Sequence, residues 1–144
     1  MKLGEIKERY KAILFGTVVV IGVIGLAYLG NYITGQPVEQ GQVRNLQISI
    51  VGEDWSIDCT MEETTNNTVY RLLLECSEIY GFEVEGTVWQ PYNAVFVDSV
   101  NDVENGDGKW WQYYVNGKYG EISSDRKQLF DGDLVEWRFE LPRF

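Results

Sequence analysis

The sequence has 144 residues, a net charge of −10 and no histidine. An acidic chain repels phosphate, which argues against nucleic acid as a partner. Without imidazole there is no histidine-based catalytic triad and no histidine-ligated metal site. No two carboxylates stand out as a general acid and a general base either. The composition therefore predicts a protein that is not an enzyme and holds no resident metal.

Residues 12–33 are expected to form a single transmembrane helix. The run AILFGTVVVIGVIGLAYLG, from Ala12 to Gly30, carries no charge. A helix needs about 20 apolar residues to cross the hydrocarbon core of a bilayer, and this run satisfies that need. A cleaved signal peptide is the alternative, but its apolar region is shorter and no Ala-x-Ala-like cleavage site follows the run.

The charges around this helix predict its orientation. Residues 1–11 contain four basic and two acidic side chains, and such a basic flank stays in the cytoplasm. Residues 34–45 are polar and contain glycine, proline and glutamine, which is typical of a linker. We therefore expect a single-pass protein of the cell membrane, with a cytoplasmic N-terminus and an extracytoplasmic domain of residues 46–144.

The domain is expected to begin with two strands and a helix. Apolar and polar residues alternate in residues 46–50 and in residues 55–60, which is typical of half-buried strands. Either Asn67 or Thr68 can cap the following helix, and Gly81 can end it. The apolar stripe of this helix consists of Val69, Leu72, Leu73, Cys76 and Tyr80.

Strands dominate after the helix. They are expected at residues 94–100, 110–115, 118–122 and 134–140. Asn116-Gly117 is a strong signal for a tight hairpin between the second and third of these strands. Residues 81–93 are interpreted as a loop. A hairpin, one helix and then further strands predict an α+β domain with one helix on a mixed sheet.

Cys59 and Cys76 both fall on inward positions, one on a strand and one on the helix. Two cysteines in a small domain outside the cytosol usually form one disulfide. A bridge between them is therefore predicted. The alternative is a pair of buried free thiols.

Two further polar motifs could be functional sites or could be ordinary surface segments. Asn66 begins an Asn-Asn-Thr sequon, so it is a candidate glycosylation site, although many sequons stay unused. An acidic loop could offer oxygen ligands to Ca²⁺, but Val103 stands at a ligand position, which contradicts an EF-hand pattern. We therefore interpret it as a solvated turn. Its polar residues are Asp98, Asn101, Asp102, Glu104, Asn105 and Asp107.

Three runs follow the helix in a characteristic order: Ala94-VFVDSVND, Trp110-WQYYVNGKYG and Leu129-FDGDLVEWRFE. With them, the chain from about residue 45 to 140 resembles the C-terminal domain of the transcobalamin and intrinsic factor family. The resemblance implies a β-grasp fold of the soluble ligand-binding type. It also implies a small-molecule ligand, with cobalamin or a related corrinoid as the candidate. These 144 residues do not include the large helical domain that holds most of the cobalamin in that family.

Aromatic residues provide the candidate binding surface. Trp111 and Tyr113 alternate with Trp110 and Tyr114, so the first pair is predicted to face the core and the second pair to face away from the helix. Tyrosine and tryptophan on an open sheet face often mark a binding surface. The alternative is that residues 81–93 fold over this face and bury it. The predicted surface consists of Trp110, Tyr114, Tyr92, Trp89 and Tyr119.

Two functions from different classes remain open at this point. The domain is either a recognition module that binds a small ligand through its aromatic face, or an accessory or structural subunit of a larger membrane or cell-surface assembly. In the second case, other membrane or surface proteins would cover the helix and the same aromatic face. A bound small molecule would favour the first function, and co-purifying subunits would favour the second.

Overall fold

A computed structural model of the protein describes residues 41–143. The predicted transmembrane helix, residues 12–33, and its basic flank lie outside these residues. Within residues 41–143, no helix has the length and apolar character needed to cross a membrane.

The larger of two sheets contains the first and the last strand of the described residues. Its five strands lie in the order β2-β1-β8-β6-β7. They are β1 (Val43–Val51), β2 (Ser56–Thr64), β6 (Trp110–Val115), β7 (Lys118–Tyr119) and β8 (Leu134–Glu140). Neighbouring strands are antiparallel except β1 and β8, which run parallel, so the predicted mixed sheet is confirmed. β1 begins inside the segment interpreted as a linker, and β7 is shorter than the predicted strand 118–122.

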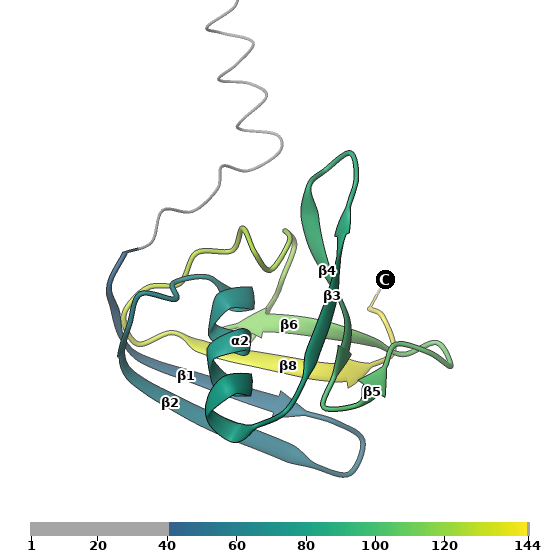
Figure 1. The fold of residues 1–144 in the computed structure, drawn as a ribbon, viewed down its shortest axis with the longest axis horizontal. Coiled ribbons are helices and arrows are strands. Elements are labelled where there is room, and N and C mark those ends of the chain that lie inside the picture. Colours follow the sequence, from purple (N-terminus) through teal and green to yellow (C-terminus); the bar gives the residue numbers. More distant parts are fainter. Residues whose placement is uncertain (1–40, 144) are drawn as a thin grey trace, which may run out of the picture. The chain divides into compact units, whose positions relative to one another are not determined.

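The single described helix, α2 (Val69–Tyr80), has the predicted ends. The Thr68 hydroxyl caps it by accepting a hydrogen bond from the Arg71 N–H, at 3.3 Å. Gly81 ends it with a φ of 74°, a left-handed conformation that glycine adopts without steric cost. The helix contacts β1 of the larger sheet (Figure 1) and buries the predicted apolar stripe except Tyr80, which is exposed because it lies in the last turn of the helix. One helix on a mixed sheet is therefore the observed arrangement.

The predicted disulfide is confirmed. Cys59 of β2 and Cys76 of α2 are bonded, with their Cα atoms 6.2 Å apart. Both side chains lie in the core, beside apolar residues from the sheet and the helix. A cross-link that closes a loop of this length stabilises a fold by about 3 kcal/mol, through the lost entropy of the unfolded chain.

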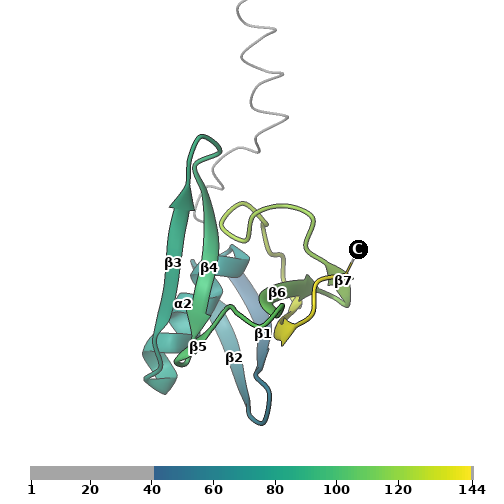
Figure 2. The same cartoon turned by 90° about the vertical axis from the view of Figure 1, so that its right-hand side faces the viewer.

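Residues 81–93 are not the loop that the sequence suggested. They contain β3 (Val84–Trp89), which pairs with β4 (Ala94–Val100), and β4 also pairs with the short β5 (Val103–Glu104). The sequence does not reveal this strand, because every residue of β3 except Val84 is exposed and apolar and polar residues therefore do not alternate. This second sheet stands beside the larger one, and its β3–β4 hairpin extends past the end of that sheet (Figure 2).

Candidate functional site

One face of β6 belongs to the core, as predicted. Trp111, Tyr113 and Val115 are all buried. The indole of Trp111 donates to the carbonyl of Val103 at 2.7 Å, and the Tyr113 hydroxyl donates to the carbonyl of Ile122 at 2.6 Å. Burial raises the pKa of the Tyr113 hydroxyl, so this group keeps its proton at alkaline pH values at which an exposed tyrosine ionises.

The opposite face of β6 is not open along its whole length, and the interpretation of Tyr114 as a surface residue is wrong. Tyr114 points away from the core but is only 2% exposed. The Arg138 guanidinium lies 4.3 Å from the centre of the Tyr114 ring, and the Tyr114 hydroxyl donates to the Glu140 carboxylate. Arg143 and Tyr119 also pack around this ring. Arginine side chains from the neighbouring strand and the C-terminal segment therefore cover this part of the face.

A groove of about 370 Å³ lies between β4, β6 and residues 119–124. Its rim is apolar and exposed: Phe96 is 41%, Trp110 43% and Ile122 53% accessible. The rings of Phe96 and Trp110 meet edge to face, with their centres 5.8 Å apart. The side chains of Trp111, Tyr113 and Trp137 also line the groove, and all three are buried. These three side chains therefore form an aromatic floor beneath the apolar rim.

Asn105 holds the two strands of the groove at a fixed separation. Its amide nitrogen donates to the Val97 carbonyl of β4 at 2.8 Å, and its amide oxygen accepts from the Trp111 N–H of β6 at 2.8 Å. The sequence placed Asn105 in a candidate calcium loop, whereas the structure gives it this bridging role. Within residues 41–143, no three carboxylate, thiolate or imidazole groups converge on a possible metal position.

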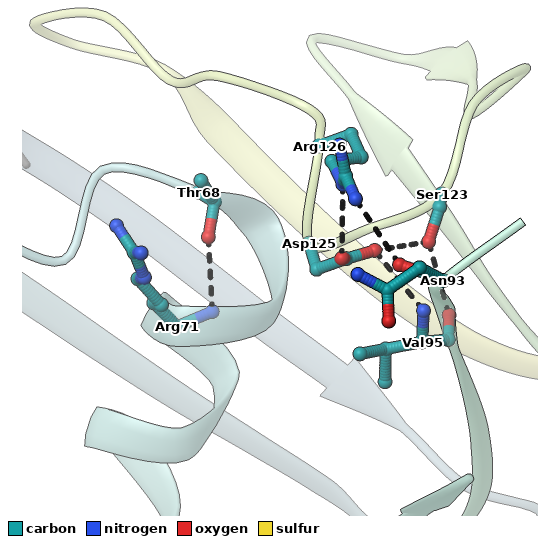
Figure 3. A network of polar contacts seen from close by, with 7 residues as sticks. All are labelled: Thr68, Arg71, Asn93, Val95, Ser123, Asp125 and Arg126. Atoms are coloured by element: carbon teal, nitrogen blue, oxygen red, sulfur yellow. Dashed lines mark hydrogen bonds and ion pairs between the residues drawn. The ribbon is translucent and has the colours of Figure 1, made fainter. Parts of the chain in front are cut away.

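A second polar network links the start of β4 to residues 123–126 (Figure 3). The Asp125 carboxylate accepts from the Val95 N–H at 3.2 Å and from the Ser123 hydroxyl. The Ser123 hydroxyl also lies 3.1 Å from the Val95 carbonyl, and Arg126 donates to the Asn93 carbonyl at 3.1 Å. The edge of β4 is thus already bonded to side chains, so it offers little template for an added peptide strand.

The groove is uncharged, because no aspartate, glutamate, lysine or arginine lines it. Two of its buried residues nevertheless have a polar atom without a partner: the indole nitrogen of Trp137 and the amide oxygen of Gln112. The Gln112 nitrogen donates to the carbonyls of Glu140 and Leu141, each at 3.1 Å, which fixes the orientation of that amide. Such a site can bind a neutral, flat and largely apolar molecule.

The structure divides the predicted aromatic surface into three places. Trp110 and Tyr119 line the groove, whereas Tyr114 is buried beneath Arg138. Trp89 and Tyr92 lie at the β3–β4 hairpin, 66% and 63% exposed, and neither lines the groove.

The prediction missed Phe96 and Ile122 on the rim of the groove. Residues 94–97 are apolar throughout, so alternation in the sequence gives no signal for Phe96, which the structure leaves exposed beside the buried Val97. Ile122 follows β7 in a segment without regular structure, where no periodicity could have placed it.

Asn66, the candidate glycosylation site, is part of the approach to α2. Its side-chain nitrogen, the atom that would carry a sugar, donates to the Glu75 carboxylate at 2.9 Å. Thr68, the third residue of the sequon, is 1% exposed and caps the helix. Attachment of a sugar would replace the bond to Glu75, and Thr68 is not accessible in the folded domain.

Several solved structures share this fold, and two of them illustrate the similarity at low sequence identity. The first is a 1.30 Å crystal structure of a Ruminococcus gnavus ATCC 29149 protein for which metal binding is proposed in its description. Its TM-score is 0.55 at 16% identity, over 69% of this chain and 99% of that one. The second is haptocorrin in complex with Cbi, with a TM-score of 0.50 at 12% identity, over 72% of this chain but only 27% of that one. These similarities support the transcobalamin-like fold that the sequence motifs suggested.

Comparison of the sequences leads to a family but to no characterised protein. No curated protein matches this sequence. Residues 66–140, which run from the approach to α2 through the last strand, match a family whose description is "Domain of unknown function (DUF4430)". The matched segment contains every residue that lines the groove except Pro142. The chain therefore belongs to the DUF4430 family.

Proposed function

We propose that this protein is a non-catalytic recognition module that binds a small ring compound in the groove between β4 and β6. The observation that carries the proposal is the groove itself, an uncharged hollow with exposed aromatic side chains at its rim and buried ones beneath. Its volume of about 370 Å³ lies within the range of ligand pockets, roughly 300–1,000 Å³. The module would be a β-grasp domain of the soluble ligand-binding type.

The size and chemistry of the groove limit the choice of ligand. The complex of haptocorrin with Cbi makes a corrinoid a candidate. A corrinoid is larger than this groove, so it could insert only an edge here, and a second protein surface would have to hold the rest. Metal binding, proposed for the Ruminococcus gnavus protein, has less support, since no three suitable donor residues converge within residues 41–143.

The ligand proposal can be tested with naphthalene as a neutral, flat probe. Full-length protein in lipid nanodiscs would be titrated while the indole N–H signals are followed by NMR. Trp110→Ser should weaken naphthalene binding by about tenfold, because a covered aromatic ring contributes on the order of 1–2 kcal/mol. Trp89→Ser, which removes an exposed indole at the β3–β4 hairpin, outside the groove, is the matched control. Equal binding by wild type and Trp110→Ser would contradict the proposed site.

We further propose that residues 12–33 anchor the module in the cell membrane, with the N-terminus in the cytoplasm and the binding domain outside. The uncharged run and the basic residues before it support this topology. Protease added to intact cells should digest the domain and leave the anchor. Full protection of the domain from the protease would contradict it.

A second candidate function is an accessory subunit of a larger membrane or surface assembly. The observation that favours it is the β3–β4 hairpin, where Val88, Trp89 and Tyr92 are each more than half exposed. Residues 86–97 carry no charge, so this hairpin is suited to a partner with an apolar surface. Purification from native membranes in mild detergent would test it. Partner proteins should co-purify with wild type, and Trp89→Ser combined with Tyr92→Ser should release them while Trp110→Ser does not.

A further inference from the structure

The β3–β4 hairpin extends past one end of the domain, the end at which α2 begins. β3 follows α2 in the chain and runs back along it. A Cβ atom added at Gly86 of β3 would lie 3.1 Å from the hydroxyl of Tyr70, which belongs to the first turn of the helix. The residues of β3 that follow Gly86 therefore lie beyond the start of α2, together with the hairpin turn (Figure 2).

The chain enters the domain at this same end. A Cβ atom added at Gly41, the first described residue, would lie 3.6 Å from the side-chain nitrogen of Asn67, which directly precedes the cap of α2. Val43 at the start of β1 pairs with Thr64, the last residue of β2 before the approach to the helix. The residues that precede the domain therefore join it at the end past which the hairpin extends.

The proposed membrane anchor would keep this end of the domain close to the bilayer. The chain from residue 33, where the anchor is expected to end, to Gly41 can extend over at most about 30 Å. A short tether also gives the groups that it joins an effective concentration of about millimolar. A surface with only a weak affinity for lipid is therefore sufficient for contact with the bilayer.

The hairpin turn and the residues beside it have the chemistry of a membrane interface. Val88, Trp89 and Tyr92 are 52%, 66% and 63% exposed. Residues 86–97 form the longest uncharged run within residues 41–143, although the domain as a whole is acidic. Tryptophan and tyrosine prefer the headgroup region of a bilayer, whereas carboxylates are repelled by anionic lipids. The hairpin can therefore enter the interface without removing a charge from water.

Side-chain hydrogen bonds hold the base of the hairpin in place. The Asp125 carboxylate accepts from the Val95 N–H at 3.2 Å, and Arg126 donates to the Asn93 carbonyl at 3.1 Å. Both bonds connect the start of β4 to the segment that follows β7. The hairpin is thus attached to the rest of the domain close to its turn, which lowers the entropy lost when the turn makes a contact.

We propose that the turn of the β3–β4 hairpin inserts Trp89 and Tyr92 into the headgroup region of the membrane that holds the anchor. This inference rests on the proposed anchor of residues 12–33. The contact would hold the domain against the bilayer in one orientation. A protein with an apolar surface is the other possible occupant of the hairpin. The bilayer is favoured because the tether and the hairpin leave the same end of the domain.

Tryptophan fluorescence can measure this contact in the full-length protein, because residues 1–54 contain no tryptophan and the whole signal comes from the domain. The protein would be reconstituted into phosphatidylcholine vesicles with and without bromine on the acyl chains near the headgroups. Bromine quenches a tryptophan that contacts the lipid, so wild type should lose emission in brominated vesicles. Trp89→Ser should remove most of this quenching. Trp110→Ser, which removes an exposed tryptophan from the groove, should retain it.

A second pair of variants keeps every tryptophan and changes only the charge. Val88→Asp places a carboxylate beside the hairpin turn and should reduce the quenching, because a carboxylate is costly to remove from water. Ile79→Asp is the matched control, since Ile79 is 61% exposed and lies in the last turn of α2, at the end opposite to the hairpin turn. This control should be quenched as strongly as wild type.

Flotation of the vesicles separates the inference from the anchor on which it rests. Protein that does not float with the vesicles would overturn the anchor, and the hairpin contact with it. Protein that floats but has equal emission in both kinds of vesicle would overturn the hairpin contact alone, as would equal quenching of wild type and Trp89→Ser. If floating protein is not quenched and the hairpin variants release a co-purifying protein, the hairpin binds a protein partner instead of lipid.

Discussion

The two faces of β6 contain the same kinds of residue but behave differently. Trp111 and Tyr113 on the core side are 5% and 7% exposed. On the other side, Trp110 is 43% exposed beside the groove, while Tyr114 is 2% exposed beneath Arg138. Residue type and alternation therefore assign a side chain to a face. The elements that pack on that face then decide whether the side chain is core, cover or binding surface.

The largest expected effect is on the core face. Trp111→Ala should destabilise the fragment of residues 37–144 by about 3–5 kcal/mol, because it leaves a cavity and removes the bond to the Val103 carbonyl. Urea unfolding followed by circular dichroism measures this loss. A loss below about 1 kcal/mol would mean that the core face is not required for folding.

The next effect tests whether the outer face is covered at Tyr114. Tyr114→Ala should cost about 2 kcal/mol, since the ring is buried and stacks on the Arg138 guanidinium. Tyr114→Phe is the matched control, because it keeps the ring and loses only the bond to Glu140, worth about 1 kcal/mol. If Tyr114→Ala unfolds at the same urea concentration as wild type, this part of the face is open after all.

A smaller effect should appear at alkaline pH. Burial raises the pKa of Tyr113, so above pH 10 the unfolded chain loses this proton while the folded chain keeps it. The stability due to this group is full below pH 10 and falls as the pH rises, by up to about 1.4 kcal/mol per pH unit. The stability of Tyr113→Phe should fall less steeply than that of wild type between pH 9 and pH 11. Parallel curves for the two proteins would contradict the burial of this hydroxyl.

The smallest effect on stability is expected at Trp110. Trp110→Ser should change the free energy of unfolding by about 1 kcal/mol or less, because the side chain is 43% exposed and contacts the partly exposed ring of Phe96. The same variant should lose affinity for naphthalene, which separates binding from folding. A loss of stability as large as that of Trp111→Ala would place Trp110 in the core and sharpen the boundary between the two faces.

Local chemistry made several features predictable. Thr68 and Gly81 bound α2 because a hydroxyl cap and a left-handed glycine act within one turn of the helix. Asn116 and Gly117 form the hairpin after β6 with φ angles of 50° and 78°, values that these residue types tolerate. The bond between Cys59 and Cys76 followed from two inward positions on neighbouring elements. In each case, residues close in sequence or a strict periodicity contained the information.

Other features depend on contacts between distant segments, and no local pattern predicts them. β3 has no buried side to produce alternation, so only its pairing with β4 makes it a strand. In the sequence, Asn105 is one of several polar loop residues. Its bridging role arises only when the backbone groups of Val97 and Trp111 come within hydrogen-bond distance of its amide.

The same limit applies to the site. From the sequence, periodicity could assign Trp110 and Tyr114 to one face of a strand, because the direction of a side chain depends only on the backbone around it. Exposure depends instead on whatever reaches that face from elsewhere in the chain. Arg138 reaches Tyr114, and a hollow remains beside Trp110. The groove and the unpartnered indole of Trp137 therefore exist only once β4, β6 and β8 have come together.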